Sequence, residues 1–227
     1  MMEVQLSSLD ISEVLRYMGC PAHQADQALV DTVTTCAQAL VKTARPRWTY
    51  RTFSISLEEE EGVRLSTGLL LPGQDLRAHL SGCHQVAVFC ATLSPQTDSL
   101  IRQAESRDML QALALDCCAT AAVEQVCDEI ETFLHGEYPG CYFPFRYSPG
   151  YGDLPLSLQG PLLALLDAPR KIGLCASATH ILTPRKSVTA LIGVSHTPVT
   201  DAKRSCLSCP AGEHCQYRKA GGHCGSK

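Results

Sequence analysis

A long helix-forming segment with small residues at its centre sets the strongest limit on how this chain folds. Between residues 107 and 135, side chains recur at spacings of three and four, the period of one helix face. The stripe consists of Met109, Leu113, Cys117, Thr120, Val123, Cys127, Ile130 and Leu134. Cysteine and alanine dominate residues 117–122, so another element or a ligand can approach the helix closely there. We therefore predict a long central helix from Arg107 to His135.

The segments before this helix predict both helices and strands. Helical spacing indicates a short helix over Asp10–Gly19 and a longer one over His23–Ala44. Alternation of aromatic or β-branched residues with polar ones over Arg47–Leu57 is typical of a half-buried strand. The run Val86–Leu93 is apolar on both faces, as a central strand is, and Ser94-Pro95 then begins another helix.

After the long helix, residues 138–153 are rich in glycine, proline and aromatics and have no period, which indicates a loop. Helical spacing returns over Leu156–Leu166, and Lys171–Ile181 with Ser187–Val194 forms a hairpin candidate. The chain has 227 residues, enough to bury a core. We predict one α+β domain over residues 1–200, with a mixed or antiparallel sheet and a long central helix, and a short Cys-rich C-terminal tail over residues 201–227.

Charge and hydropathy argue against two classes of partner. Lys and Arg number 19 against 23 Asp and Glu, and a net charge of -4 gives no electrostatic footprint for nucleic acid. The N-terminal residues lack a basic stretch followed by an apolar run, and no window reaches the roughly 18 uncharged apolar residues of a membrane span. We therefore expect a cytoplasmic protein that binds neither nucleic acid nor membrane.

The segment RYSPGYGD, residues 146–153, is a candidate ligand loop. Arginine offers a planar fork that suits a carboxylate, and glycine lets a ligand lie against backbone groups. Such a loop suits an amino-acid-bearing ligand. Its residues alone equally allow a well-ordered surface turn.

Four segments, in order, strengthen the functional interpretation of this loop: EVLRYMG, RDMLQALALDCCATAAVEQVCDEIE, RYSPGYGDLPLSLQ and TPRKSVTALIGV. Together they resemble free-standing relatives of the activation domain of cobalamin-dependent methionine synthase. The Arg-x-x-x-Gly-Tyr pattern within the third segment is the signature of the S-adenosylmethionine site in that domain. The resemblance covers about residues 8–196 and implies an α+β fold.

The resemblance also implies roles for individual residues. Arg146 is the expected anchor of the methionine carboxylate. Tyr151 is expected beside the reactive methyl group, as the one candidate catalytic residue, and Asp10 matches weakly an aspartate that holds the ammonium. The backbone of the intervening loop is expected to contact the adenosine, through Ser148, Pro149 and Gly150.

One position departs from the family pattern. With Asp116 aligned to the aspartate of the family helix, Thr120 stands where the family has a glutamate that helps to hold the ammonium. Glu124, one turn further along, replaces it only if the ligand or the helix is shifted by about 6 Å. The alternative is that Asp116, Thr120 and Glu124, at i, i+4 and i+8, form a solvated helix flank.

The activity implied by the resemblance is the reductive methylation of a corrinoid carried by another polypeptide. An inactive cobalt centre of a partner methionine synthase, or of a related corrinoid methyltransferase, receives one electron from a flavodoxin or another reductant. Methyl transfer from S-adenosylmethionine then traps the reduced cobalamin. The chain is thus expected to be an accessory domain of a methyltransferase, which acts by positioning the methyl donor.

The C-terminal tail carries a second constellation. Four cysteines crowd into the last 22 residues, a polar segment that cannot form its own core and that suits a tetrahedral zinc ion or an iron-sulfur cluster. These metal-ligand candidates are Cys206, Cys209, Cys215 and Cys224. A disordered reduced tail is the alternative. The rival function is a non-catalytic metal or electron-transfer adaptor of a corrinoid protein, with a decayed S-adenosylmethionine site.

Overall fold

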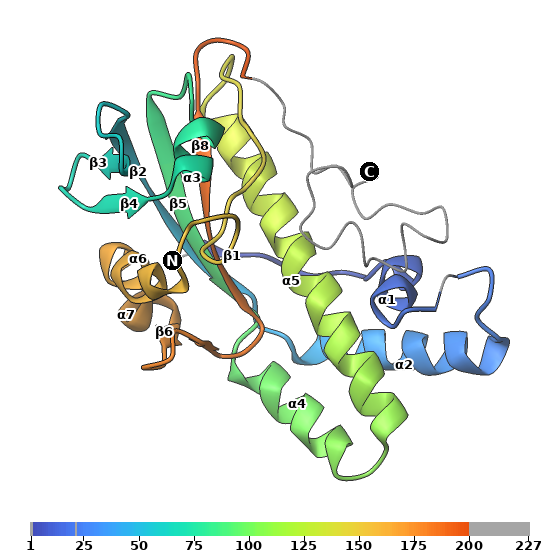
Figure 1. Ribbon diagram of the computed structural model, residues 1–227. Helices are drawn as coiled ribbons and strands as arrows, with labels where there is room; N and C mark the ends of the chain where they lie inside the picture. The colour runs from blue at the N-terminus through green and yellow to red at the C-terminus, as the bar shows by residue number, and fades with distance from the viewer. Residues whose placement is uncertain (1, 21, 200–227) are drawn as a thin grey trace.

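An antiparallel sheet separates two layers of helices in the computed structural model, which describes residues 2–20 and 22–199 (Figure 1). Successive residues of the central strand β5 (Gln85–Thr92) point to opposite faces of the sheet. Ala87, Phe89 and Ala91 join the core under helices α1, α2, α4 and α5. Val86 and Val88 join the other core, under helices α3, α6 and α7. The predicted α+β class is confirmed.

The sheet has six strands, and every pairing in it is antiparallel. The strand order is β4-β3-β2-β5-β8, and β1 pairs with the beginning of β2. The remaining strands are β1 Met2–Glu3, β2 Arg47–Ser56, β3 Gly62–Leu65, β4 Leu70–Pro72 and β8 Ser187–Val194. The central position predicted for Val86–Leu93 is confirmed, because β5 lies between β2 and β8.

The helices begin where the sequence provides caps. Side chains of Asp10, Asp26 and Asp108 accept hydrogen bonds from backbone N–H groups in the first turns of α1, α2 and α5, which would otherwise lack partners. The helices are α1 Ile11–Tyr17, α2 Gln27–Thr43, α3 Gln74–His79, α4 Pro95–Glu105, α5 Met109–Glu137, α6 Gln159–Leu166 and α7 Ala168–Ile172, with a 3-10 turn at Leu156–Leu158.

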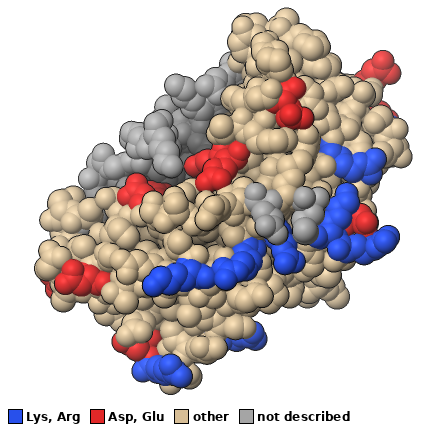
Figure 2. Space-filling view, turned by 180° about the vertical axis from the view of Figure 1, so that it is seen from behind, with Lys and Arg blue, Asp and Glu red and all other residues tan. Residues whose placement is uncertain are grey.

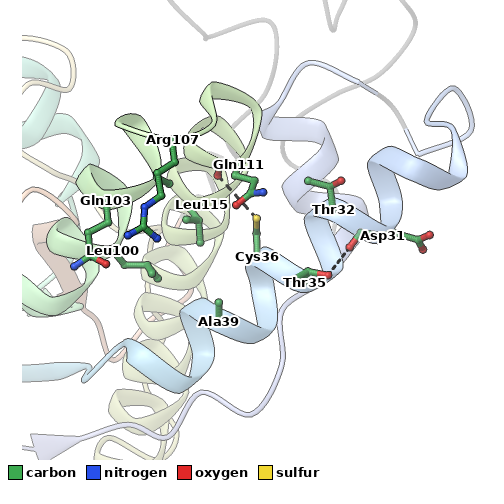
Figure 3. Close-up of a pocket in the computed structure, with 11 residues that line it drawn as sticks. Asp31, Thr32, Thr35, Cys36, Ala39, Leu100, Gln103, Arg107, Gln111 and Leu115 are labelled. Atoms are coloured by element: carbon green, nitrogen blue, oxygen red, sulfur yellow. Dashed lines mark hydrogen bonds between the residues drawn. The ribbon is translucent and has the colours of Figure 1, made fainter.

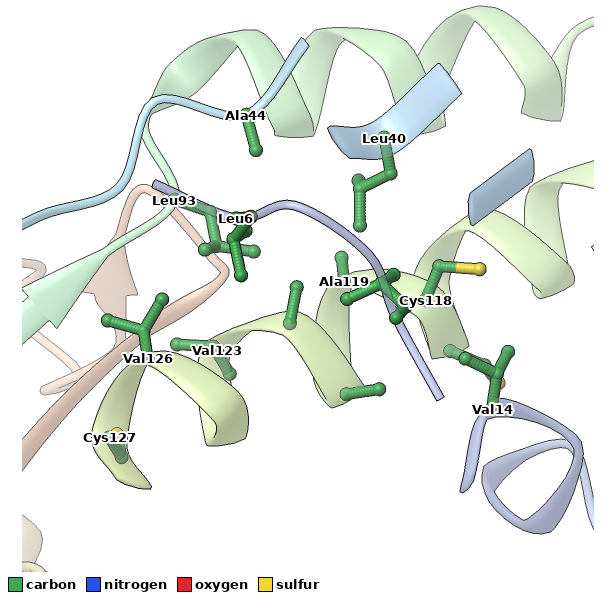
Figure 4. Close-up of a cluster of buried hydrophobic side chains, with 14 of the residues drawn as sticks. Leu6, Val14, Leu40, Ala44, Leu93, Cys118, Ala119, Val123, Val126 and Cys127 are labelled. Carbon is green, nitrogen blue, oxygen red and sulfur yellow. The ribbon is translucent and has the colours of Figure 1, made fainter. Parts of the chain in front are cut away.

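The small residues of α5 are the centre of the larger core. Cys118, Ala119 and Ala122 are completely buried, and Figure 4 shows Cys118 and Ala119 among the side chains of neighbouring elements. Leu40 from α2 and Val14 from α1 reach into the same cluster. Short side chains let these elements approach the α5 backbone, so the close approach predicted from residues 117–122 is confirmed. Interiors are packed to crystal-like density, so little room remains for larger side chains there.

Within the described residues, α5 is the one helix that is long and apolar enough to cross a membrane. Core helices of ordinary domains share that length and composition, and 61% of its most apolar window is buried inside this protein. The apolar character of α5 is therefore accounted for by the core that it forms.

The predicted hairpin of Lys171–Ile181 with Ser187–Val194 is wrong. Residues 168–172 form helix α7, and two short strands after it, β6 (Cys175–Ala176) and β7 (Leu182–Thr183), pair with each other. β8 pairs with β5 instead. The physical reason is that β8 is buried on both faces from Thr189 onward, and only a position inside the main sheet covers two faces.

The face opposite to that of Figure 1 carries a band of Lys and Arg side chains, with acidic side chains scattered around it (Figure 2). On β2, Arg51 is exposed and its Nη1 donates a hydrogen bond to the backbone oxygen of Leu165 in α6, at 3.1 Å. Arg51 therefore ties α6 to the sheet.

A close approach at Gly193 positions the candidate ligand loop. The chain that leads into that loop, residues 142–147, runs along the outer edge of β8 through two bridges, Tyr142 with Ser195 and Tyr147 with Leu191. A Cβ at Gly193 would lie 2.5 Å from Sγ of Cys83 and 3.0 Å from Cγ of Pro144. The absence of a side chain at residue 193 therefore lets the segment lie against the sheet.

Replacing Gly193 with alanine is expected to lower the free energy of unfolding by about 1–3 kcal/mol, the usual cost of overpacking. Gly136→Ala is the matched control, because nothing lies within 4 Å of a Cβ built at Gly136 and alanine favours the helix that contains it. Urea unfolding of the two variants measures the difference. Equal stability of both would show that Gly193 is not closely packed.

Candidate functional site

The backbone bridge of the next residue, Tyr147, positions Arg146 beside β8. Backbone N–H and C=O groups of Tyr147 exchange two hydrogen bonds of 2.8 Å with Leu191 of β8. Tyr147 is buried, whereas the neighbouring Arg146 extends towards the flank of α5, where its partners lie. The bridge on β8 thus fixes the point from which the arginine reaches the helix.

Asp153 fastens the other end of the loop to α3. Its carboxylate accepts hydrogen bonds from the backbone N–H groups of Gln74, at 2.6 Å, and of Asp75, at 3.3 Å. α3 has no capping side chain of its own at Gly73, so Asp153, 79 residues after Gln74, supplies the cap. The loop and α3 are consequently held as one unit.

Arg146 is the centre of an ionic cluster on α5. One of its terminal nitrogens lies 2.5 Å from a carboxylate oxygen of Glu124, and the other lies 2.9 Å from Asp128 and also pairs with Glu131. The arginine side chain is only 11% exposed, whereas the three carboxylates are 30–45% exposed. Three carboxylates around one guanidinium leave a local excess of negative charge.

The titration of this cluster follows from its environment. Burial lowers the pKa of Arg146, but the acidic groups around it, Cys127, Glu131 and Glu124, raise it more, so the net shift is upward. Burial raises the pKa of the Cys127 thiol to about 12, so that thiol is neutral at ordinary pH. The carboxylates therefore keep Arg146 charged.

A second ionic contact lies one helical turn away on the same flank. Nζ of Lys186 lies 2.9 Å from a carboxylate oxygen of Asp116 and donates a 3.0 Å hydrogen bond to Oγ1 of Thr120. Arg185 approaches the same aspartate at 4.0 Å. The polar line predicted for Asp116, Thr120 and Glu124 therefore lies on one flank of α5. It meets basic side chains from the turn before β8 and from the candidate ligand loop.

The tip of the loop combines an exposed ring with a backbone that is already hydrogen-bonded. Tyr151 is 40% exposed, and its ring meets that of Tyr147 edge-on with centroids 5.8 Å apart. The N–H of Gly150 donates to Leu154, and the N–H of Tyr151 donates to Ser148. Contacts from this backbone to an adenosine would therefore use its carbonyl groups rather than these two N–H groups.

The remaining loop residues keep the tip compact. Gly150 has φ +95 and Gly152 has φ +48, conformations that favour glycine. A Cβ at Gly152 would meet the hydroxyl of Tyr147 and the carboxylate of Asp75. Burial, followed by the charges of Asp75 and Asp153, raises the pKa of Tyr147 to about 12. Pro149 is buried and Ser148 is partly buried, so neither forms the outer surface of the tip.

Asp10 lies at the start of α1, and Tyr17, at the other end of this helix, is the residue that senses the ionic cluster around Arg146. Its carboxylate accepts hydrogen bonds from the N–H groups of Ser12, at 2.9 Å, and Glu13, at 3.3 Å, and so caps the helix. Tyr17, at the other end of α1, has its pKa raised by burial and then by the charge of Glu124. The seven residues of α1 span about 10 Å, so Asp10 lies about that far from Tyr17 along the helix axis.

A cavity of about 410 Å³ lies elsewhere, between α2, α4 and α5 (Figure 3). Cys36 points into it, and its thiol lies 3.9 Å from the backbone oxygen of Gln111. Arg107, Leu115 and Asp31 also line it. None of the predicted ligand residues lines this cavity. The cavity is therefore separate from the charged flank, the side of α5 that carries Asp116, Thr120 and Glu124.

Two histidines and a cysteine come together that sequence reasoning did not connect. Sγ of Cys141 lies 3.6 Å from Nδ1 of His196, whose ring stacks on that of His84 at 3.9 Å. These residues are up to 112 positions apart, and no spacing pattern links them. Across residues 2–20 and 22–199, no group of three or more His, Cys, Asp or Glu side chains has an arrangement that could hold a metal. The predicted ligands Cys206, Cys209, Cys215 and Cys224 lie outside the described residues.

Comparison with known proteins gives the fold a precedent. No protein-family model matches the chain, and no curated protein matches it. Among solved structures, the MetH reactivation domain bound to AdoHcy is similar, with a TM-score of 0.63 over 97% of this chain and 86% of that one, at 15% identity. The chain is thus an α+β domain with a long core helix and a charged flank. Its fold is that of the MetH reactivation domain.

Arg146→Gln is expected to lower the free energy of unfolding by about 1–3 kcal/mol. Removing one partner of a buried ion pair costs about 3–5 kcal/mol, but solvent screens these partly exposed carboxylates. Added salt should restore part of the loss, because it weakens the repulsion among Glu124, Asp128 and Glu131. Denaturant unfolding of Arg170→Gln is the control, since that guanidinium is 87% exposed. Equal stability of Arg146→Gln and Arg170→Gln would show that the ion pairs of Arg146 do not stabilise the fold.

His79 is expected to make stability depend on pH. Its Nε2–H donates to the backbone oxygen of Phe145 at 2.8 Å, and burial lowers its pKa below 6.5 despite that hydrogen bond. The unfolded chain therefore binds the proton more readily, so the free energy of unfolding falls as pH drops through about 6.5. His79→Gln should weaken this dependence, measured by urea unfolding between pH 7.5 and 5.5. His84 is present in both proteins, so its contribution to the pH dependence cancels in the comparison. If the free energy of unfolding depended on pH equally in both proteins, His79 would not be the neutral, buried group responsible.

Proposed function

We propose that this chain binds S-adenosylmethionine and supports the reductive methylation of the cobalamin carried by a partner methionine synthase or a related corrinoid methyltransferase. The observation that carries the proposal is the shared fold with a reactivation domain that was solved with AdoHcy bound. AdoHcy is what S-adenosylmethionine becomes when its methyl group leaves. The Arg146–Asp153 loop beside α5 is the proposed binding region.

The residues beside the loop have the chemistry that this ligand needs. S-adenosylmethionine carries a carboxylate, an ammonium and a sulfonium, so its site needs a cation and an excess of carboxylates close together. The flank of α5 provides both, in the contacts of Lys186 with Asp116 and in the carboxylates around Arg146. The exposed ring of Tyr151 offers an aromatic surface at the edge of the same region.

The task proposed for the chain is to hold the methyl donor in position. One electron from a flavodoxin or another reductant converts cob(II)alamin to cob(I)alamin on the partner. The cobalt then takes the methyl cation of S-adenosylmethionine, which leaves methylcobalamin and AdoHcy. No proton moves in this step, so it needs no general acid or base, and the contribution of the chain is orientation. Tyr151 is the residue proposed to face the methyl group.

The proposal also includes a cellular compartment and a metal site in the C-terminal tail. The protein would act in the cytoplasm, where methyl donor and reductant are present. Zinc or an iron-sulfur cluster at Cys206, Cys209, Cys215 and Cys224 remains proposed from the sequence alone. An iron-sulfur cluster there could pass electrons to the partner, and zinc could not, because zinc has no redox chemistry.

A second candidate is an adaptor in which the S-adenosylmethionine site has decayed. The observation in its favour is that Lys186 already places an ammonium on Thr120, the position at which the family resemblance leads one to expect the ammonium of the ligand. The same ammonium also pairs with Asp116. The two N–H groups of the loop tip are likewise already bonded within the protein. Ligand binding distinguishes the two candidates.

Calorimetry with S-adenosylmethionine is expected to show one binding site per chain. Tyr151→Phe should retain the affinity, because most of the contact area of the ring survives. It should slow the recovery of methylcobalamin from cob(II)alamin on a cobalamin-binding methionine synthase module supplied with a flavodoxin system. Arg107→Gln is the control, because Arg107 lines the separate cavity and should affect neither measurement.

Absence of binding to the wild-type chain would favour the adaptor. Loss of S-adenosylmethionine binding in Arg107→Gln alone would indicate that the ligand binds in the cavity between α2, α4 and α5. Equal recovery rates for wild type and Tyr151→Phe would make Tyr151 a packing residue with no part in orienting the donor.

A further inference from the structure

The first two turns of α5 expose apolar side chains that the core does not use. Met109 is 72% exposed and Leu113 is 50% exposed, although both belong to the stripe whose later members Ile130 and Leu134 are completely buried. Leu110, in the same turn as Met109, is 48% exposed. Apolar area stabilises a protein only when it leaves water, so these side chains contribute little to the fold. Adjacent exposed apolar side chains often mark a binding surface.

Met109 and Leu113 lie on the same helix face as the charged flank. Side chains three and four residues apart are neighbours on a helix, so Leu113 follows Met109 and Asp116 follows Leu113 on one face. Thr120 and Glu124 continue this face at a spacing of four. The side of α5 that borders the proposed ligand region therefore continues, toward the beginning of the helix, as an apolar surface.

Apolar side chains are also exposed beyond the other end of the flank. Arg146, which pairs with Glu124, begins the candidate ligand loop. Tyr151 in this loop is 40% exposed. Leu156, which follows the loop, is 51% exposed, and a Cβ built at Gly150 would lie 3.1 Å from its Cδ2. A partner that covers the ligand region thus meets apolar side chains on α5 and on the loop.

We infer that Met109 and Leu113 form a docking surface for the protein that carries the corrinoid. This inference rests on the proposed function and names the surface through which the chain meets that partner. Methyl transfer requires the donor and the cobalt to be in contact and aligned, so the partner must lie over the face that holds the donor. The two side chains are on that face, and the partner buries them when it docks.

The dimensions of α5 agree with a single partner domain. Met109 precedes Glu124 by 15 residues, or about 22 Å along the helix axis. A small domain is about 30 Å across, so one domain that lies across the flank spans both residues. No second contact elsewhere on the chain is needed to reach Met109.

The small number of exposed apolar side chains favours a transient contact. Weak, transient interfaces bury less than about 1,200 Å². The reactivated partner has to separate before it resumes its own reaction, which a weak contact allows. A lasting contact between two copies of this chain through the same face would instead cover the ligand region and exclude the cobalt.

Replacing Met109 and Leu113 together with glutamine tests the surface. Glutamine favours a helix about as well as methionine and leucine, and both side chains are exposed, so the double variant should fold, as thermal unfolding can check. In the recovery of methylcobalamin from cob(II)alamin, its KM for a cobalamin-binding methionine synthase module should rise at least about 10-fold, because apolar contact area is lost. Its affinity for S-adenosylmethionine, measured by calorimetry, should not change.

Two further variants are the controls. Met109→Leu combined with Leu113→Met keeps the surface apolar and should keep the KM of wild type. Ile181→Gln removes an apolar side chain that is 63% exposed but lies between β6 and β7, which form a sheet of their own. This variant should also leave the KM for the module unchanged.

The possible outcomes separate the docking surface from the proposed function. If wild type binds S-adenosylmethionine but the glutamine double variant keeps its KM, or if Ile181→Gln raises the KM equally, the docking surface is wrong and the proposed function stands. A wild-type dimer that the double variant converts to monomers in sedimentation, with an unchanged KM, would assign the surface to a second copy and overturn the inference. A wild-type chain that does not bind S-adenosylmethionine would overturn the proposed function and this inference with it.

Discussion

The close packing of α5 against its neighbours is the constraint on which the rest of the structure depends. Cys118, Ala119 and Ala122 are completely buried, and their small side chains allow α1 and α2 to approach the helix. Larger residues there would push those helices away from α5. This packing therefore fixes the position of the helix whose flank contacts Lys186 and Arg146.

The charged flank is a consequence of the same arrangement. A helix of 29 residues turns its small and apolar side chains toward the core, so its polar residues collect on the remaining flank. The turn before β8 and the loop bridged to β8 lie close to that flank, and they supply three basic side chains. The result is a row of acidic side chains on α5 that pair with basic side chains from distant parts of the chain.

Local patterns in the sequence were sufficient to predict the long helix, the strand at residues 47–57 and the central strand at residues 86–93, because period and burial determine those elements. The hairpin prediction failed because both faces of β8 are buried only within the main sheet, between the two helix layers, and no local pattern records that position. For the site, the sequence indicated the loop and the polar line on α5. It could not reveal that Arg146 would meet three carboxylates or that Lys186 would meet Thr120, since the partners are 15 to 66 residues apart.

The cap that Asp153 places on α3 has a consequence for how this chain can change over evolutionary time. A Cβ at Gly73 would collide with the Asp153 carboxylate, which also binds the N–H of Gln74. Neither position can vary independently: a side chain at residue 73 excludes the aspartate, and loss of the aspartate leaves α3 uncapped. Homologues that share this arrangement should therefore retain or lose the two residues together, and such paired variation would identify relatives whose overall identity is too low to detect.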